Sequence, residues 1–167
     1  AKFAEAGHIL GSAGLSLVLN EKGRKVRFWF SGDIGRRKLP ILRDPVLPDE
    51  VDYLLMECTY GDKPHRDPQM AYEEFRAVVK RTSERGGKVI IPAFAVGRTQ
   101  ELVYWLNEMF SNGDLKPVPV FVDSPLALRG LAIYRSHPEL FDADVRALVA
   151  RGQDPFDDVV GDQPHGV

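Results

Sequence analysis

The chain has 167 residues, of which 44% are hydrophobic and 28% are charged, and this composition is typical of a folded globular protein of one or two small domains. It excludes collagen-like, low-complexity and disordered classes, and no apolar run approaches the roughly 20 residues that a membrane span needs. A net charge of −2 offers no global basic field for nucleic acid, and a single cysteine, Cys58, excludes an internal disulfide and favours a reducing, cytoplasmic compartment.

The first 60 residues are predicted to form strands and turns. Residues 15–20 (LSLVLN) alternate apolar and polar side chains, a turn follows at residues 21–23, and residues 26–30 (VRFWF) supply a second strand, so this segment predicts a β-hairpin. Residues 51–56 form a short apolar run between acidic residues and Thr-Tyr-Gly, and this run predicts a buried strand.

From about residue 63 the pattern changes to alternating helices and strands. Asp67 and Pro68 suit the cap and the first position of a helix, and the apolar residues that follow share one helical face: Ala71, Tyr72, Phe75, Val78 and Val79. The pattern then predicts strands over 88–91 and 118–122, and helices over 98–110, from Ser124-Pro125 onward and over 141–150. This order predicts an α/β fold with a mostly parallel sheet, and the change of pattern places a domain boundary near residues 61–64.

Basic residues gather in the first hairpin and in the segment that follows it. Between Glu21 and Arg43 the chain has eight basic residues and two acidic ones, which gives a local net charge of +6. Such a stretch can follow the phosphates of a nucleic acid, and more often it is simply the solvated surface of a hairpin. The sequence leaves both interpretations open.

Polar side chains follow the ends of the predicted strands, which is where parallel α/β sheets bind ligands. Asp33 and Glu57 come after the second and third predicted strands, Arg98 after the fourth, and Ser124 after the fifth. His8 lies in GHILGSAG, where small residues let the backbone approach a ligand closely.

Each of these residues also has an ordinary structural explanation. Taken alone, His8 is better explained as a structural or incidental histidine, because one histidine with a distant aspartate is poor evidence for a metal. Glu57 is either an acid–base group or a strand-end carboxylate that accepts hydrogen bonds from backbone amides. The other histidines, His65, His137 and His165, are expected to be solvated, and Cys58 is expected to be a small core residue.

Five segments, in this order, resemble motifs of the metallo-β-lactamase/β-CASP nucleases: AGHILGSAG, FSGDIGR, LLMECTYGD, PAFAVGRTQEL and VDSPLA. This group includes RNA-processing enzymes such as RNase J, the endonuclease subunit of eukaryotic mRNA 3′-end cleavage, and DNA-repair nucleases. The resemblance covers roughly residues 5–157. It implies an α/β fold in which residues 1–62 are the C-terminal part of a metallo-β-lactamase αββα sandwich, and residues 63–167 are the first βαβ units of a parallel-sheet β-CASP domain.

The resemblance also implies a site with two zinc ions that hydrolyses phosphodiester bonds of single-stranded RNA. His8 matches a zinc ligand, Asp33 matches the aspartate that bridges the two ions, and Glu57 matches an acid that helps position a histidine acting on the leaving group. The metals of the family activate a water and stabilise the displacement at phosphorus. Arg98 and Ser124 lie in segments that resemble the β-CASP scaffold and are candidates for RNA contact, although Arg98 is equally explained as a structural arginine.

Two departures from the family pattern limit what this chain can do alone. The H-x-H-x-D-H motif, which supplies most zinc ligands in the family, is absent from the chain, and so are the later β-CASP histidines, which His165 does not match. A zinc ion needs about four ligands. The chain is therefore expected to be a piece of a longer enzyme, to bind zinc weakly and to be inactive by itself; the alternative is a small complete protein with a processed N-terminus.

Other functions and an association state remain open on the sequence. A non-catalytic paralogue that binds RNA or an active partner is one alternative, although His8 and Asp33 argue against it. DNA is the alternative substrate, whereas ECTYGD and PAFAVGRTQEL look more like the RNA-acting branch. Half of a catalytic sandwich leaves sheet edges and apolar faces uncovered, so the chain is expected to form a homo-oligomer.

Overall fold

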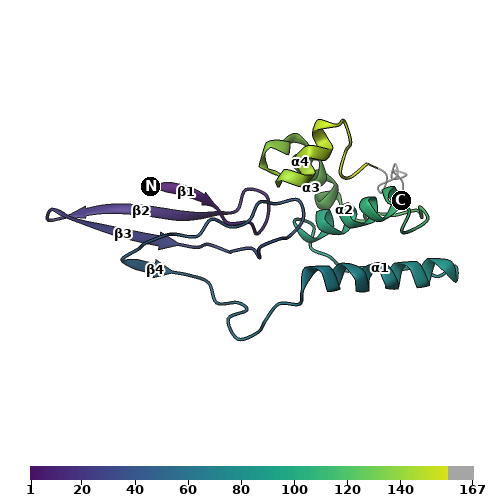
Figure 1. The fold of residues 1–167 in the computed structure, drawn as a ribbon, viewed down its shortest axis with the longest axis horizontal. Helices are drawn as coiled ribbons and strands as arrows, with labels where there is room; N and C mark the ends of the chain where they lie inside the picture. Colours follow the sequence, from purple (N-terminus) through teal and green to yellow (C-terminus); the bar gives the residue numbers. More distant parts are fainter. Residues whose placement is uncertain (158–167) are drawn as a thin grey trace. The chain divides into compact units, whose positions relative to one another are not determined.

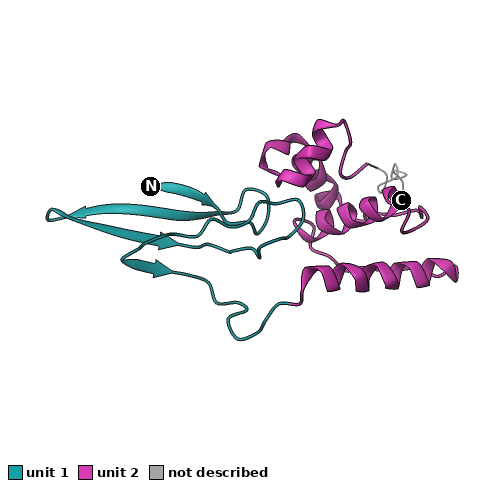
Figure 2. Cartoon of the chain, viewed as in Figure 1, with its two compact units in different colours: residues 1–65 teal, residues 66–167 magenta. Residues whose placement is uncertain are grey.

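The computed structural model describes residues 1–157, and the chain divides into two compact units between His65 and Arg66 (Figures 1 and 2). The first unit is a four-stranded sheet with its loops, and the second unit is helical. Together they give the mixed α/β class that the sequence predicts. The assignment of residues 1–62 and 63–167 to two family domains stays a prediction. Within the described residues, no helix is long and apolar enough to cross a membrane.

The sheet of the first unit contains four strands in sequence order: β1 (Lys2–Glu5), β2 (Ala13–Glu21), β3 (Arg24–Phe30) and β4 (Tyr53–Leu55). β2 pairs antiparallel with both β1 and β3, and β4 pairs parallel with β3. The β2–β3 hairpin is therefore confirmed, whereas β1 has no counterpart among the predicted elements. Because of this pairing, β1, β3 and β4 all run in the same direction.

One face of this sheet is apolar over most of its length. Strand pairing brings these side chains onto the same face in rows: Phe3, Leu15, Leu17, Leu19, Val26, Phe28, Phe30, Tyr53 and Leu55. The described part of this unit holds no helix that could cover the face, and Tyr53 and Leu55 are 59% and 55% exposed. The prediction of a strand within residues 51–56 is confirmed, but the prediction that it is buried is wrong, because no layer covers this edge strand.

The second unit contains the α-helices α1 (Pro68–Glu84), α2 (Arg98–Ser111), α3 (Pro125–Ser136) and α4 (Ala143–Ala150), with the short 3₁₀ helix η1 (Pro138–Leu140) before α4. The predicted starts of α1 and α3 are confirmed. The Asp67 carboxylate accepts hydrogen bonds from two amides of the first turn of α1, and the Ser124 hydroxyl does the same for one amide of α3. Proline follows each cap at the first helical position, where its missing N–H costs nothing.

Helix α2 forms the core of the second unit. Six of its apolar side chains are buried: Val103, Tyr104, Trp105, Leu106, Met109 and Phe110. The Trp105 ring contacts two rings of α1, with its centroid 5.6 Å from that of Tyr72 and 6.0 Å from that of Phe75. Gln100 is fully buried, and its amide nitrogen donates to the carbonyl oxygens of Ala95 at 3.0 Å and of Ala127 in α3 at 3.4 Å. α2 thus holds both neighbouring helices.

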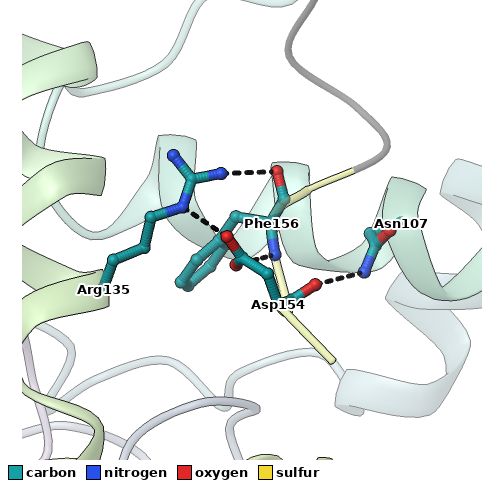
Figure 3. A network of polar contacts seen from close by, with 4 residues as sticks. All are labelled: Asn107, Arg135, Asp154 and Phe156. Atoms are coloured by element: carbon teal, nitrogen blue, oxygen red, sulfur yellow. Dashed lines mark hydrogen bonds and ion pairs between the residues drawn. The ribbon is translucent and has the colours of Figure 1, made fainter. Parts of the chain in front are cut away.

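The segment after α4 is fastened to this helical core by Arg135 (Figure 3). The Arg135 guanidinium donates to the Asp154 carboxylate at 2.7 Å and to the Phe156 carbonyl oxygen at 3.1 Å. The Asn107 side chain of α2 donates to the Asp154 carbonyl oxygen at 3.4 Å. Residues 154–156 therefore belong to the core of the unit rather than to a loose tail.

The strands predicted over residues 88–91 and 118–122 do not form in the described part of the chain; within these two segments, only Val120 takes part in an isolated β-bridge. Apolar side chains of both segments are exposed, Ile90 by 89% and Phe121 by 69%. A parallel strand obtains its hydrogen bonds from neighbouring strands, so a short apolar run does not become a strand by itself. Within residues 1–157, the helices of the predicted βαβ units are present, and their parallel sheet is not.

Candidate functional site

The loops that carry His8, Asp33 and Glu57 leave the sheet of the first unit at the same edge. β1 leads into the loop of His8, β3 leads into the loop of Asp33, and β4 ends two residues before Glu57. Since these three strands run in the same direction, their carboxyl ends lie at one edge of the sheet. Three of the predicted site residues are therefore placed at this edge from three separate segments of sequence.

Close backbone packing joins the His8 loop to the Asp33 loop. The Gly35 amide donates to the Ala6 carbonyl oxygen at 2.8 Å. The approach is so tight that a Cβ on Gly35 would lie 1.7 Å from the Gly7 carbonyl oxygen. Only glycine fits at position 35 without moving one of the two loops.

Ser31 joins the ends of β3 and β4. This residue is 1% exposed, and its amide donates to the Leu55 carbonyl oxygen at 3.0 Å. Its hydroxyl accepts a hydrogen bond from the Glu57 amide at 3.1 Å and donates to the Gly32 carbonyl oxygen at 2.6 Å. Ser31 is not among the residues predicted from the sequence, although a serine directly after an apolar strand is well suited to satisfy strand-end backbone groups.

Short-range hydrogen bonds shape the loop around His8. The Ser12 hydroxyl accepts from the amides of His8 at 3.0 Å and Ile9 at 3.2 Å, and the Glu5 carboxylate accepts from the Gly7 amide at 2.9 Å. Gly7 has a φ of 63°, a left-handed conformation that favours glycine. These contacts fix the backbone and leave His8 exposed.

The Glu57 carboxylate is hydrogen-bonded to the loop that carries Asp33. Its Oε1 accepts from the Ile34 amide at 2.7 Å. The Thr59 hydroxyl, followed by the Ile34 amide, lowers the pKa of Glu57 below its ordinary value; partial burial opposes this shift, and the charge of His8 adds to it. Glu57 is therefore a strand-end carboxylate that accepts a hydrogen bond from a backbone amide, as one of its two explanations requires. It also lies near enough to His8 for their charges to interact.

His65 and His137 are exposed as predicted, and His165 lies outside the described residues. Cys58 is exposed, so the prediction of a small core residue is wrong. The physical reason is its position, because it follows the short strand β4 at the uncovered edge of the sheet.

Arg98 and Ser124 lie in the second unit, each at the start of a helix. Arg98 forms an ion pair with Glu101 at 2.6 Å, with half of the Arg98 side chain exposed. The Ser124 hydroxyl accepts from the Ala127 amide at 3.2 Å as the cap of α3. Gln100 connects the two helix starts through its contact with the Ala127 carbonyl oxygen. Both residues thus have structural partners, and a contact with RNA stays a prediction for each.

The residues of this chain do not complete a zinc site on their own. Across residues 1–157, no group of three or more histidine, cysteine, aspartate and glutamate side chains could hold a metal ion. His8 and Asp33 offer one donor group each, and the Oε1 atom of Glu57 is occupied by the Ile34 amide. Since zinc takes about four ligands, a metal bound here needs further ligands from another part of the protein.

Comparison with known proteins finds relatives along almost the whole chain. Residues 99–161 match the Beta-Casp domain. A ribonuclease of Thermus thermophilus is 41% identical over 155 residues, which are 92% of this chain and 34% of that protein. An RNase J-like protein of Methanocaldococcus jannaschii is 36% identical over 164 residues, covering 95% of this chain and 37% of that protein. The cleavage and polyadenylation specificity factor subunit 3-I of Arabidopsis thaliana is 37% identical over 134 residues, 79% of this chain and 19% of that protein. The chain spans little more than a third of the length of these relatives at most.

Proposed function

We infer that the chain belongs to the β-CASP nucleases of the metallo-β-lactamase superfamily, and we propose that it is part of a ribonuclease that hydrolyses phosphodiester bonds of single-stranded RNA. The observation that carries the proposal is the 41% identity to a protein named as a ribonuclease over 92% of this chain. Because the chain spans about a third of that relative, the activity is proposed for the whole protein that contains it.

The two units fit a division of this enzyme into two domains. We assign residues 1–62 to a partial metallo-β-lactamase domain and residues 63–167 to a partial β-CASP domain, and the Beta-Casp match at residues 99–161 supports the second assignment. The single cysteine suits a reducing compartment, so we place the enzyme in the cytoplasm.

We propose His8 and Asp33 as zinc ligands. Imidazole and carboxylate groups are both common ligands of zinc, and both side chains are exposed at the same edge of the sheet. When bound with its remaining ligands, zinc would supply a nucleophilic water and stabilise negative charge on the phosphate. This chain contributes the fixed loops that present the two ligands, held by the Gly35–Ala6 hydrogen bond and by the contacts of Ser31.

Glu57 is proposed to act beside these ligands as an ionised carboxylate. Its lowered pKa keeps the group charged at neutral pH, and its hydrogen bond to the Ile34 amide fixes the loop of Asp33. A carboxylate in this position can orient a histidine that acts on the leaving group, as the family resemblance implies. Arg98 and Ser124 are proposed to contact the RNA, because a half-exposed guanidinium and a helix start both attract phosphate.

The proposal is tested with the longer protein that contains this chain and a labelled single-stranded RNA. We expect RNA cleavage that requires zinc, that stops after chelation and returns with added metal, and that falls at least about 100-fold in the Asp33→Asn variant. Asp49→Asn, which changes another exposed carboxylate of the same unit, is the matched control and should leave the rate unchanged. Full activity in Asp33→Asn or after chelation contradicts the zinc site. Cleavage of DNA in preference to RNA contradicts the substrate.

A further inference from the structure

The tip of the β2–β3 hairpin carries positive charge that the candidate site does not use. Three exposed residues, Lys22, Arg24 and Lys25, make up this basic tip. Glu21 lies directly across the strand pair from Arg24 and is the acidic residue of the tip, so residues 21–25 have a net charge of +2.

The basic tip stands beyond the four-stranded part of the sheet. β1 pairs with β2 only as far as Ser16, and β4 pairs with β3 from Phe28 onward. β2 and β3 remain paired with each other out to Glu21 and Arg24. Residues 17–27 therefore form a two-stranded ribbon that extends past the outer strands, as Figure 1 shows for the purple hairpin.

Ion pairing distinguishes the tip of this ribbon from its base. At the base, the Arg27 guanidinium pairs with Glu50 at 3.2 Å, and the Arg27 amide donates to the Asp52 carboxylate at 2.7 Å. Among the residues that the structure describes, the three cations of the basic tip form no ion pair. Their charge is therefore available to an anion from outside the chain.

The turn geometry distributes these cations around the tip. Lys22 and Gly23 have φ values of 48° and 82°, the left-handed pair typical of a two-residue type I′ turn, in which asparagine commonly precedes glycine. Arg24 and Lys25 follow on opposite faces of β3, because successive strand residues alternate between the faces. An extended polyanion that crosses the tip therefore meets a cation in the turn and one on either side.

We propose that the basic tip binds the phosphodiester backbone of single-stranded RNA, at a place separate from the cleavage site. The choice of RNA rests on the proposed function. A two-stranded ribbon can present side chains to a nucleic acid, and lysine and arginine that neutralise phosphates release bound counterions. The apolar face of the sheet can be covered by further parts of the protein, whereas unpaired lysine and arginine heads remain in water. In this chain the three side chains of the basic tip are exposed to solvent.

The test measures binding of a fluorescent oligouridine to the 167-residue chain at several salt concentrations. The variant K22N/R24T/K25T removes the three charges, places Asn-Gly in the turn, and puts β-favouring threonine in the strand. We expect it to bind at least about tenfold more weakly. The slope of log K against log salt should become shallower by about 2, because each single-strand phosphate contact contributes about 0.7. If the triple variant does not fold, the single variant Lys22→Asn, which suits the turn, still tests the proposal. It should make the slope of log K against log salt shallower by about 0.7.

The matched control removes three exposed charges from the second unit, in the variant K80Q/R81Q/K88Q. It has the same net charge as the tip variant and should keep the affinity and the salt slope of the wild type. Equal affinities of the wild type and the tip variant, an equal loss in the control, or no binding by the wild type at low salt each overturn the proposal. Competition by polyglutamate as strong as that by RNA at equal charge overturns the choice of RNA and assigns the tip to an acidic protein.

These outcomes are distinguishable from a failure of the proposed function. Binding is measured without cleavage and without zinc, and the residues of the basic tip lie outside the candidate site. If RNA binding depends on the tip but the longer protein shows no zinc-dependent cleavage, the proposed function is contradicted and this inference stands. If cleavage depends on Asp33 but the wild type and the tip variant bind RNA equally well, this inference is contradicted and the proposed function stands.

Discussion

Replacing Phe156 tests whether the segment after α4 belongs to the core of the second unit. The Phe156 ring is 0% exposed, and its centroid lies 6.2 Å from that of Tyr134 and 6.3 Å from that of Phe141, both in edge-to-face geometry. Phe156→Ala removes this ring and leaves a cavity, while the carbonyl oxygen that accepts from Arg135 remains. Removal of a fully buried phenylalanine costs about 3–5 kcal/mol, which is a large share of the roughly 5–15 kcal/mol that stabilises a domain.

Urea denaturation followed by tryptophan fluorescence measures this loss. The chain has two tryptophans, Trp29 in the first unit and Trp105 in the second, so a Trp29→Phe background makes the signal specific to the second unit. Phe121→Ala is the control, because the Phe121 side chain is 69% exposed and its removal should change the free energy of unfolding by less than about 0.5 kcal/mol. A loss below about 1 kcal/mol in Phe156→Ala, or equal losses in both variants, would refute the assignment of this segment to the core.

Four further predictions follow from the described contacts. Asp67→Ala removes the acceptor of two amides of α1 and should cost about 1 kcal/mol in urea denaturation, whereas Asp67→Asn should recover most of it; equal losses would contradict the capping role. Burial raises the pKa of Glu108, so the charged form of this side chain is disfavoured in the folded state. The folded state therefore loses stability as the pH rises through the pKa of an unfolded glutamate. Glu108→Gln, which can still accept from Tyr72, should therefore raise the Tm at pH 7 and leave it unchanged at pH 3, and a lower Tm at pH 7 would contradict this sign. The 167-residue chain should show no RNA cleavage and only weak zinc binding by calorimetry, and robust zinc-dependent cleavage by this chain would overturn the view that it is incomplete. The apolar face of the first unit predicts a dimer or larger assembly in light scattering at high micromolar concentration; Leu19→Lys should shift it toward monomer, and a monomeric wild type would exclude the association.

The helices of the second unit were predictable because their signals are local. Asp67-Pro68 and Ser124-Pro125 each combine a cap with a residue pre-shaped for the first turn, and α1 and α3 begin at those prolines. Residues 88–91 and 118–122 were predicted as strands from composition alone. A strand depends on partners elsewhere in the sequence, and an apolar run carries no information about whether those partners are present.

The sequence predicts which residues belong to the candidate site, and their roles stay predictions, whereas the contacts between their loops could not be predicted. His8, Asp33 and Glu57 were identified from motifs, and the structure puts their loops at one edge of the sheet. The hydrogen bond from the Ile34 amide to Glu57 depends on the register of the parallel β3–β4 pair, which the sequence does not reveal. The role of Ser31 depends on the same register, and it was missed for the same reason.

We propose that this chain is part of a metal-dependent nuclease whose other zinc ligands lie outside it. The measurement that tests it most directly is the coding sequence upstream of Ala1. We predict an in-frame H-x-H-x-D-H motif there, which would supply the ligands that His8 and Asp33 lack. A reading frame that begins at or near Ala1 without this motif would contradict the claim and would leave the chain as a protein that binds RNA or a partner without cleaving.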